Sequence, residues 1–342
     1  MPIEPVGSVM KILRSFLLFG ASLFLLSAVA WDAAWAEEKI KISYSSTDTT
    51  NAVYFVALEQ NFYKRYGLEA ELIFIPSTAT TIASLLSGDI QVANATGGAI
   101  ASAAVGGANP VMIACHINTL PYELVVHESI KSAEELKGRS IGISQVGSLS
   151  DMASRFLVRG LGLEPVKDVF ITPVGGSTEM VPALRAGRIV AFPSIPGIVN
   201  LAKDMPYRIL ITAADSQKRF DFPYLCTNTT KTFLASQRDT VKKVIMALIE
   251  ATQFFKTRRE ESKKIIAKYS KQNNEAYLES SYNAMRKLYE QVPLVTRSGL
   301  ELQINEARAN KPGARILFEE LVDESVVKEL EKSGFIDRVY RH

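Results

Sequence analysis

The sequence predicts an α/β protein with two lobes, each built around a largely parallel sheet with crossover helices. Two observations lead to this prediction. Strand-like and helix-like segments alternate along most of the chain, which is the pattern of βαβ units. The same order of segments also occurs twice, the second time about a hundred residues after the first. The 342 residues are enough to bury two separate cores.

The first copy of this unit combines alternating apolar residues with glycines that end helices. Ile40, Ile42 and Tyr44 alternate along the first strand, and Gly67 and Gly88 follow the two helical patterns. We therefore expect strands at 39–46, 68–75 and 89–95, and helices at 50–66 and 78–88.

The second copy repeats both the order and the spacing of the first. Gly67-Leu68-Glu69 corresponds to Gly162-Leu163-Glu164 after the first helix of each copy. Four residues of the first copy recur with the same internal spacing in the second: Ile82, Leu85, Gly88 and Ile90 as Val181, Leu184, Gly187 and Ile189. The expected elements of the second copy are strands at 140–145, 168–174 and 189–195, with helices at 148–162 and 177–187. The repetition indicates an internal duplication, with one copy in each lobe.

Composition excludes several classes of protein. Lys and Arg number 39 against 36 Asp and Glu, so the net charge is only +3, and 47% of the residues are hydrophobic. This balance is not that of a disordered chain or of a basic nucleic-acid-binding domain. Cys115 and Cys226 are the only cysteines, too few for a disulfide-rich scaffold or a four-cysteine zinc site. We expect no nucleic-acid partner, no metal and no cofactor.

Residues 1–36 are expected to be a signal peptide. Lys11 and Arg14 precede an apolar run over 16–30, which is shorter than the roughly 20 residues needed to span a bilayer. Ala34 and Ala36 flank Trp35 as in an A-x-A peptidase site, which predicts cleavage after Ala36 and a periplasmic location. Met10 is an alternative start to Met1.

The chain should pass from one lobe to the other at two crossovers, near 120–126 and 221–227. The expected division is lobe 1 over 37–122, lobe 2 over 123–225, and a return to lobe 1 with the C-terminal helices over 226–342. Cys115 and Cys226 both lie near these crossovers. The sequence leaves open whether they form a disulfide or stay as thiols.

The C-terminal part of the chain is predicted to be helical. Ser236, with Asp239 three residues later, is expected to cap a long helix. Amphipathic patterns follow at 258–269, 274–290 and 323–333. The charges over 256–264 alternate in sign, which indicates a solvated helix face and not a basic patch.

Five segments, in order along the chain after residue 36, resemble one family. They are ALEQNFYKRYGLEAELIFI (57–75), LLSGDIQVANATGGA (85–99), ELKGRSIGISQVGS (135–148), LRAGRIVAF (184–192) and VDESVVKELEKSGFID (322–337). These segments are similar to the periplasmic substrate-binding proteins of ABC importers, within the SsuA/THI5-like, or NMT1-like, family. The resemblance implies a type II periplasmic-binding-protein fold, with two α/β lobes, two crossover strands and a ligand cleft between the lobes.

The resemblance also implies a function. Members of this family capture a small molecule and deliver it to the membrane permease of an ABC importer, and we expect a monomer with no enzymatic activity. The family does not fix the solute, which on this basis is an organic acid, a sulfonate, or an aromatic or heterocyclic compound.

The candidate ligand site lies in the loops that follow the strands, because open α/β sheets bind ligands beyond the carboxyl ends of their strands. These loops are rich in hydroxyl groups and most lead into helices, whose free N–H groups attract anions. A helix cap explains each single Ser or Thr equally well. The candidate ligand-binding residues are Ser46, Thr47, Asn51, Thr78, Thr96, Gly97, His116, Tyr122, Ser148 and Ser194.

The same loops contain no Arg or Lys, so a bound anion would depend on helix dipoles and hydroxyl groups. Asp48 and Asp151 are interpreted as solvent-facing acids in the first turns of helices. A small, partly apolar organic acid fits this lining better than an inorganic anion. The candidates for aromatic contacts are Tyr54, Tyr122, Phe192 and Tyr224, each of which is also a candidate core residue.

Two alternatives to a transport protein stay open. A periplasmic sensor would use the same cleft without a permease, and an enzyme of the same fold would consume its ligand. The sequence contains no H-E-x-x-H, G-x-S-x-G, P-loop or Rossmann motif. The pyrimidine-forming eukaryotic members of the resembled family need an iron site with clustered cysteines, which Cys115 and Cys226 cannot supply.

The predicted cleavage has a spectroscopic consequence. Trp31 and Trp35 are the only tryptophans of the chain, and both lie before the cleavage site. We expect the exported protein to begin at Glu37 and to show tyrosine but no tryptophan fluorescence, as checked by N-terminal sequencing and emission spectra. Tryptophan emission from the purified periplasmic protein would contradict cleavage after Ala36.

Overall fold

A computed structural model describes residues 37–342, except 147, 203–206, 218–219, 310, 312 and 342. The predicted signal peptide therefore lies outside the described residues. Lys39–His342 form one compact unit. Among the described residues, no helix combines the length and the apolar character needed to cross a membrane.

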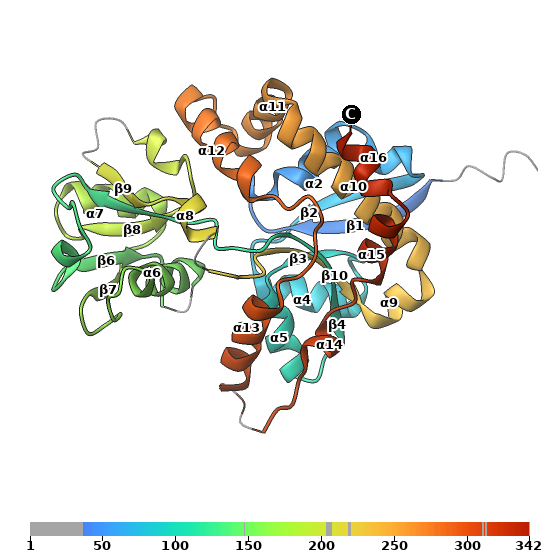
Figure 1. The fold of residues 1–342 in the computed structure, drawn as a ribbon, viewed down its shortest axis with the longest axis horizontal. Coiled ribbons are helices and arrows are strands. Elements are labelled where there is room, and N and C mark those ends of the chain that lie inside the picture. The colour runs from blue at the N-terminus through green and yellow to red at the C-terminus, as the bar shows by residue number, and fades with distance from the viewer. Residues whose placement is uncertain are drawn as a thin grey trace, which may run out of the picture. The chain divides into compact units, whose positions relative to one another are not determined.

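We call the elements from β1 to β4 and from β10 to α16 lobe 1, and the elements from β5 to α8 lobe 2 (Figure 1). The strands of lobe 1 are β1 (Glu38–Tyr44), β2 (Leu68–Phe74), β3 (Ala93–Ala95), β4 (Pro110–Ile117) and β10 (Leu225–Thr230). β1 pairs with β2, and β10 lies between β3 and β4, antiparallel to both. A parallel bridge between Ile42 and Val92 connects the two groups, giving the order β2-β1-β3-β10-β4.

Lobe 2 contains a five-stranded sheet in the order β7-β6-β8-β5-β9. Its strands are β5 (Glu123–His127), β6 (Ser140–Ile143), β7 (Phe170–Pro173), β8 (Ala191–Ser194) and β9 (Tyr207–Ile211). β6 is parallel to β7 and β8, whereas β5 is antiparallel to β8 and β9. The mixed α/β architecture with two lobes confirms the predicted fold class.

The strand orders of the two lobes correspond position by position, since β10 and β5 occupy the same place in their sheets. The glycines that revealed the duplication have matching backbone conformations. Gly67 and Gly162 have φ of 75° and 78°, and Gly88 and Gly187 have φ of 85° and 70°. Glycine adopts this left-handed conformation without the steric cost that other residues bear. The shared sequence pattern therefore marks shared helix ends.

Helices cover both sheets (Figure 1). Those of lobe 1 before the first crossover are η2 (Thr49–Asn51), α2 (Ala52–Glu59), α3 (Phe62–Arg65), α4 (Thr78–Ser87) and α5 (Gly97–Val105). Those of lobe 2 are η3 (Glu134–Leu136), α6 (Leu149–Gly160), α7 (Ser177–Arg185), η4 (Ile198–Leu201) and α8 (Ala213–Gln217). The C-terminal helices are α9 (Lys231–Ser236), α10 (Arg238–Thr257), α11 (Arg259–Ser270), α12 (Glu275–Leu288), α13 (Arg297–Ala309), α14 (Phe318–Leu321), α15 (Ser325–Lys332) and α16 (Phe335–Tyr340).

Two sequence-based expectations for helices were wrong in detail. The helix expected at 50–66 is divided, because Asn61 adopts a left-handed conformation (φ 56°) between α2 and α3. Ser236 does not cap α10 but is the last residue of α9, and its Oγ donates to Thr232 O at 3.0 Å. Thr230 provides the cap of α9 by accepting from Phe233 N.

Helix α13 was not predicted from the sequence, and its apolar side packs on α5. Leu300, Ile304 and Ala307 are buried at the helical spacing of four and three residues. Gly97 at the start of α5 makes this packing possible, since a Cβ there would lie 2.8 Å from Leu300 Cδ1 and 3.0 Å from Pro223 Cβ.

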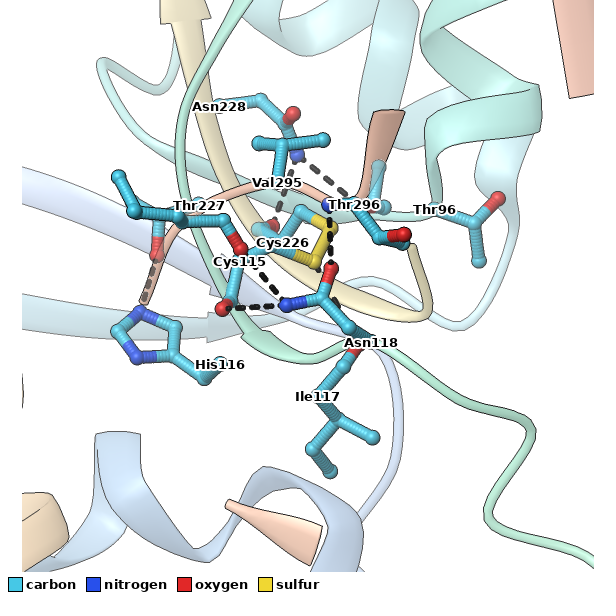
Figure 2. Close-up of a disulfide and its surroundings, with 12 residues drawn as sticks. Thr96, Cys115, His116, Ile117, Asn118, Cys226, Thr227, Asn228, Val295 and Thr296 are labelled. Atoms are coloured by element: carbon cyan, nitrogen blue, oxygen red, sulfur yellow. Dashed lines mark hydrogen bonds between the residues drawn. A yellow bond between two sulfur atoms is a disulfide. The ribbon is translucent and has the colours of Figure 1, made fainter. Parts of the chain in front are cut away.

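The two lobes are connected by 118–122, between β4 and β5, and by a return segment that ends at Tyr224, before β10. A third segment, 290–296, runs beside the start of the first crossover. The Asn118 amide donates to Leu294 O (2.7 Å) and accepts from Thr296 N (3.1 Å), as Figure 2 shows. Asp221 of the return segment accepts from Ser298 Oγ. Both crossovers are thus anchored to the segment that precedes and begins α13.

The question left open by the two cysteines is answered by their strand register. Cys115 of β4 lies opposite Cys226 of β10, and the two form a disulfide (Figure 2). Both strands belong to the sheet of lobe 1, so the bond does not connect the lobes. It closes a loop that contains all of lobe 2, because the two cysteines are 111 residues apart in sequence.

Removing this cross-link should destabilise the protein. A Cys115→Ala/Cys226→Ala variant is expected to lose about 2–5 kcal/mol of unfolding free energy, because the unfolded chain regains the freedom of the closed loop. Denaturant unfolding of wild type and variant measures the difference, and thiol titration of unfolded wild type should find no free thiol. Cys115→Ala alone is the control, and it should match the double variant. Equal unfolding midpoints for wild type and double variant would contradict the prediction.

Candidate functional site

The candidate site is located by the ends of four strands. β10 is antiparallel to β3, with Cys226 opposite Ala95, and β5 is antiparallel to β8, with Glu123 opposite Ser194. Each crossover therefore meets a sheet at the carboxyl ends of its parallel strands, where α/β proteins bind ligands. The loop after β1 and the two crossovers form the part of this edge on which side chains converge.

The loop after β1 is organised around the carboxylate of Asp48. Asp48 caps η2, since its Oδ1 accepts from Thr50 N at 2.8 Å and also from the Thr50 hydroxyl. Its Oδ2 accepts from Ser46 Oγ at 2.5 Å. The Tyr289 hydroxyl, at the end of α12, donates to Thr49 O (2.8 Å) and Thr50 O (3.1 Å) and so holds the backbone of the loop in place. Asp48 and Ser46 are half-buried, and Thr47 is exposed.

The two crossovers each contribute one tyrosine beside this loop. The rings of Tyr122 and Tyr224 are nearly perpendicular (82°), with centroids 6.4 Å apart. Both side chains are half-buried, yet burial, together with the negative charge of Asp48, raises the pKa of each hydroxyl above its ordinary value. The charge of Asp48 also acts on Tyr277 of α12, whose pKa is raised by burial and by Asp48.

The groups of the loop and of the crossovers affect one another electrostatically. The Tyr122 and Tyr224 hydroxyls affect each other's pKa, and the Thr50 side chain also affects the pKa of Tyr224. Thr50 donates in turn to Asp48. The expected interpretation of Asp48 as a solvent-facing acid is therefore only partly correct, because it caps a helix but its charge reaches the tyrosines of both crossovers.

A buried polar layer supports this surface from within lobe 1. Thr227 Oγ1 lies 3.0 Å from both the Tyr54 hydroxyl and His116 Nε2, and all three side chains are buried. Burial lowers the pKa of His116 to about 4, so its ring is neutral at physiological pH. Asn51 is buried as well and accepts from Asn94 Nδ2. The structure places His116, Asn51 and Tyr54 beneath the surface of the site and not on it.

The remaining lobe 1 candidates lie at helix starts. Thr96 caps α5 by accepting from Ala99 N at 3.3 Å, and Gly97 N donates to Pro223 O at 2.9 Å. Gly97 thereby holds the return crossover against α5. Thr78 is exposed at the start of α4, where the cap is its neighbour Ser77.

Lobe 2 contributes a group of three serines at the end of β6. The hydroxyls of Ser144, Ser148 and Ser150 lie 2.8–2.9 Å from one another, and Ser148 caps α6 by accepting from Asp151 N. The expectation of a solvent-facing Asp151 was wrong. Its side chain is buried and accepts from Arg155 Nε at 2.7 Å, one turn along α6. A cavity of about 200 Å³ adjoins Ser148 and Asp151 and reaches Glu306 of α13 in lobe 1.

Ser194 ends β8 with its hydroxyl donating to Ile195 O at 3.1 Å, and Phe192 is part of the lobe 2 core. The following loop touches lobe 1, since Ser281 Oγ of α12 donates to Pro196 O at 3.0 Å. Gly197 permits this contact, because a Cβ there would lie 2.9 Å from Tyr277 O. A second cavity, of about 380 Å³, lies at the crossovers and is lined by Asn118, Asp221, Glu290 and the backbone segment to Thr296.

The structure thus places Ser46 of the predicted set in one hydrogen-bonded loop with Asp48 and Thr50, and it pairs Tyr122 with Tyr224, which was one of the aromatic candidates. Ser148 and Ser194 lie at the corresponding edge of lobe 2. Among the residues that the structure describes, no group of three His, Cys, Asp or Glu side chains is arranged to hold a metal ion. The sequence signal for Asp48 and Thr50, which were not in the predicted set, was their position after a strand.

The sequence matches the NMT1-like family over residues 34–270. The chain belongs to this family. A protein of Brucella abortus (strain 2308), named as a binding protein, is 24% identical over 300 residues, which cover 84% of this chain and 88% of the relative. The predicted family resemblance is confirmed.

Solved structures show the same fold. The periplasmic aliphatic sulphonate binding protein SsuA from Escherichia coli aligns with a TM-score of 0.66 at 19% identity, over 80% of this chain and 88% of that one. The periplasmic nitrate-binding protein NrtA from Synechocystis PCC 6803 aligns with a TM-score of 0.60 at 14% identity, over 86% and 88% of the two chains. These relatives of the NMT1-like chain are named as binding proteins and not as enzymes.

The edge of lobe 2 holds a carboxyl group whose titration should be measurable. Glu123 is 4% exposed, its Oε1 has no hydrogen-bond partner, and burial raises its pKa to about 7 from 4.5. Protonated Glu123 is thus favoured in the folded state, so its contribution to stability is complete below about pH 4.5 and is lost as pH rises through about 7.

We expect Glu123→Gln to abolish this loss. The unfolding free energy of the variant minus that of wild type should increase by up to roughly 3 kcal/mol between about pH 4 and pH 8. Denaturant unfolding across this range measures the difference, in which the contribution of His116 cancels. Glu128→Gln is the matched control, because Glu128 is exposed and directly follows β5, the strand that begins with Glu123. A pH-independent difference for Glu123→Gln would show that the carboxyl is not desolvated.

Proposed function

We propose that this protein is an exported solute-binding protein that captures a small organic molecule between its lobes and delivers it to an ABC-type permease. The observation that carries the proposal is the contact between the rings of Tyr122 and Tyr224, one from each crossover. Side chains so placed contact a ligand while they belong to the segments about which the lobes move. Membership of the NMT1-like family supports the same function.

Lobe closure is the proposed means of capture. Only the two crossovers carry the chain between the lobes, and few-residue connections of this kind act as hinges in domain closure. The anchoring of Asn118 and Asp221 to the start of α13 fixes the lobe 1 ends of both hinges. We therefore place the bending within 119–122 and within the residues just before Tyr224, next to the two tyrosines. A ligand that touches these tyrosines is coupled directly to closure.

The solute-binding function predicts ligand-dependent stability without turnover. A solute that binds the folded protein at a hundredfold excess over its Kd should stabilise it by about 2.7 kcal/mol. Thermal-shift screening of the purified protein against carboxylates, sulfonates, pyrimidines and organic amines measures this. The solute should be recovered unchanged after denaturation, and a Tyr122→Ala/Tyr224→Ala variant should lose the shift.

Two controls make the screen decisive. Tyr340→Phe, in α16 outside the site, should respond to the solute as wild type does. Chemical conversion of the solute would contradict a binding protein, and absence of a shift across all four classes would contradict capture of a small organic molecule. Co-purification of the permease with the solute-loaded protein tests the delivery step.

A further inference from the structure

The loop after β1 in lobe 1 contains an anionic group of its own, the carboxylate of Asp48. Free N–H and hydroxyl donors at a helix start are the groups with which such loops bind anionic ligands. Here Thr50 N–H, the Thr50 hydroxyl and the Ser46 hydroxyl all donate to the carboxylate of Asp48. A sulfonate or carboxylate ligand would have to displace these bonds and would also meet the negative charge of Asp48. The loop therefore disfavours an anion at this position.

The charge of Asp48 has no cationic partner within the described part of the chain. None of the ion pairs formed by its Lys and Arg side chains includes Asp48. Its three bonds all come from neutral groups of the same loop, and Oδ2 accepts only one of them. A half-buried carboxylate in this state can accept a further donor, and a positive charge would stabilise it most.

The walls beside Asp48 are aromatic. Tyr122 and Tyr224 present two nearly perpendicular rings, 6.4 Å apart, and both keep solvent-accessible surface. The start of β10, which follows Tyr224, lies at the same edge of the lobe 1 sheet as the loop after β1, and the negative charge of Asp48 acts on both tyrosine hydroxyls, which places rings and carboxylate in one group. Aromatic faces attract cations within about 6 Å of the ring centre, and perpendicular rings near a carboxylate form two sides of a cation-binding box.

We propose that the solute carries an organic ammonium group, with Asp48 as its counter-ion and the Tyr122 and Tyr224 rings as its walls. This inference rests on the proposed function, because it names the class of solute that the same site takes. It differs from that function in a testable way, since a solute-binding protein can select an anion or a cation with the same lobes and hinges.

The test compares probes that differ in the charged group. Choline is paired with isethionate, and benzylammonium with phenylmethanesulfonate, each with the purified wild-type protein in calorimetric titration and thermal shift. At least one ammonium probe is expected to bind, and its sulfonate counterpart is expected to bind about tenfold more weakly or not at all. Sodium chloride at the same concentration should produce no shift, because the aromatic walls select an organic cation.

Variants assign the effect to Asp48. Asp48→Asn keeps a capping oxygen for Thr50 N and removes the charge, so affinity for the ammonium probe should fall about tenfold or more. Asp89→Asn is the matched control, since Asp89 is exposed at the opposite end of β3, and it should bind as wild type does. If Asp48→Asn does not fold, Tyr122→Leu replaces it, with Tyr122→Phe as control. The leucine variant should lose affinity and the phenylalanine variant should keep most of it.

The outcomes separate this inference from the proposed function. Preferential binding of the sulfonate probes, or unchanged ammonium binding by Asp48→Asn, would overturn the ammonium assignment and leave solute capture intact. Equal shifts with sodium chloride would overturn it as well. If the ammonium probes give no shift while another organic class does, the assignment fails alone. If no organic class binds to the folded protein, both fail.

Discussion

The insertion of β10 between β3 and β4 is the pairing on which the site depends. Because β10 runs antiparallel to β3, its first residue lies at the carboxyl edge of the sheet, and the return crossover must end there. The first crossover leaves β4 at the same edge. Tyr224, directly before β10, and Tyr122, directly before β5, are therefore brought together by strand topology and not by their own sequence neighbourhoods. The same register sets Cys226 opposite Cys115 and Thr227 beside His116.

The site combines buried neutral side chains with a half-buried carboxylate, and burial explains this difference in charge. Tyr54, Thr227 and His116 satisfy one another's polar atoms beneath the surface, and a charged imidazole there would be costly. Asp48 is half-buried and accepts hydrogen bonds from its own loop. Tyr289 supports the loop that carries Asp48, because its hydroxyl donates to the backbone of that loop. The position of the carboxylate is thus fixed by groups that carry no charge.

Local signals in the sequence predicted the parts of the fold that local forces determine. Gly67, Gly88, Gly162 and Gly187 occupy left-handed positions that few other residues tolerate, so their spacing revealed the duplicated unit. Ser236 was misassigned because a cap signal is short, and its hydroxyl donates to the backbone of α9, whose last residue it is. Neither helix α13 nor the effect of the Asp48 charge on Tyr122 and Tyr224 could be predicted, since both depend on residues far away in sequence. The pairing of the two cysteines required the register of β4 and β10, which no spacing along the chain reveals.

The fold alone does not decide what the cleft binds, because proteins named for sulfonate and for nitrate binding share it with this chain. The decision lies with a few side chains at the strand ends. In lobe 1 the start of η2 already holds a carboxylate that is covalently part of the loop and therefore loses no translational freedom in binding there. An external anion would have to compete with this tethered group for the same donors. The Ser46 and Thr50 donors of the loop are consequently bonded to Asp48. The group that the loop presents to a ligand is the negatively charged Asp48 carboxylate, which accepts hydrogen bonds.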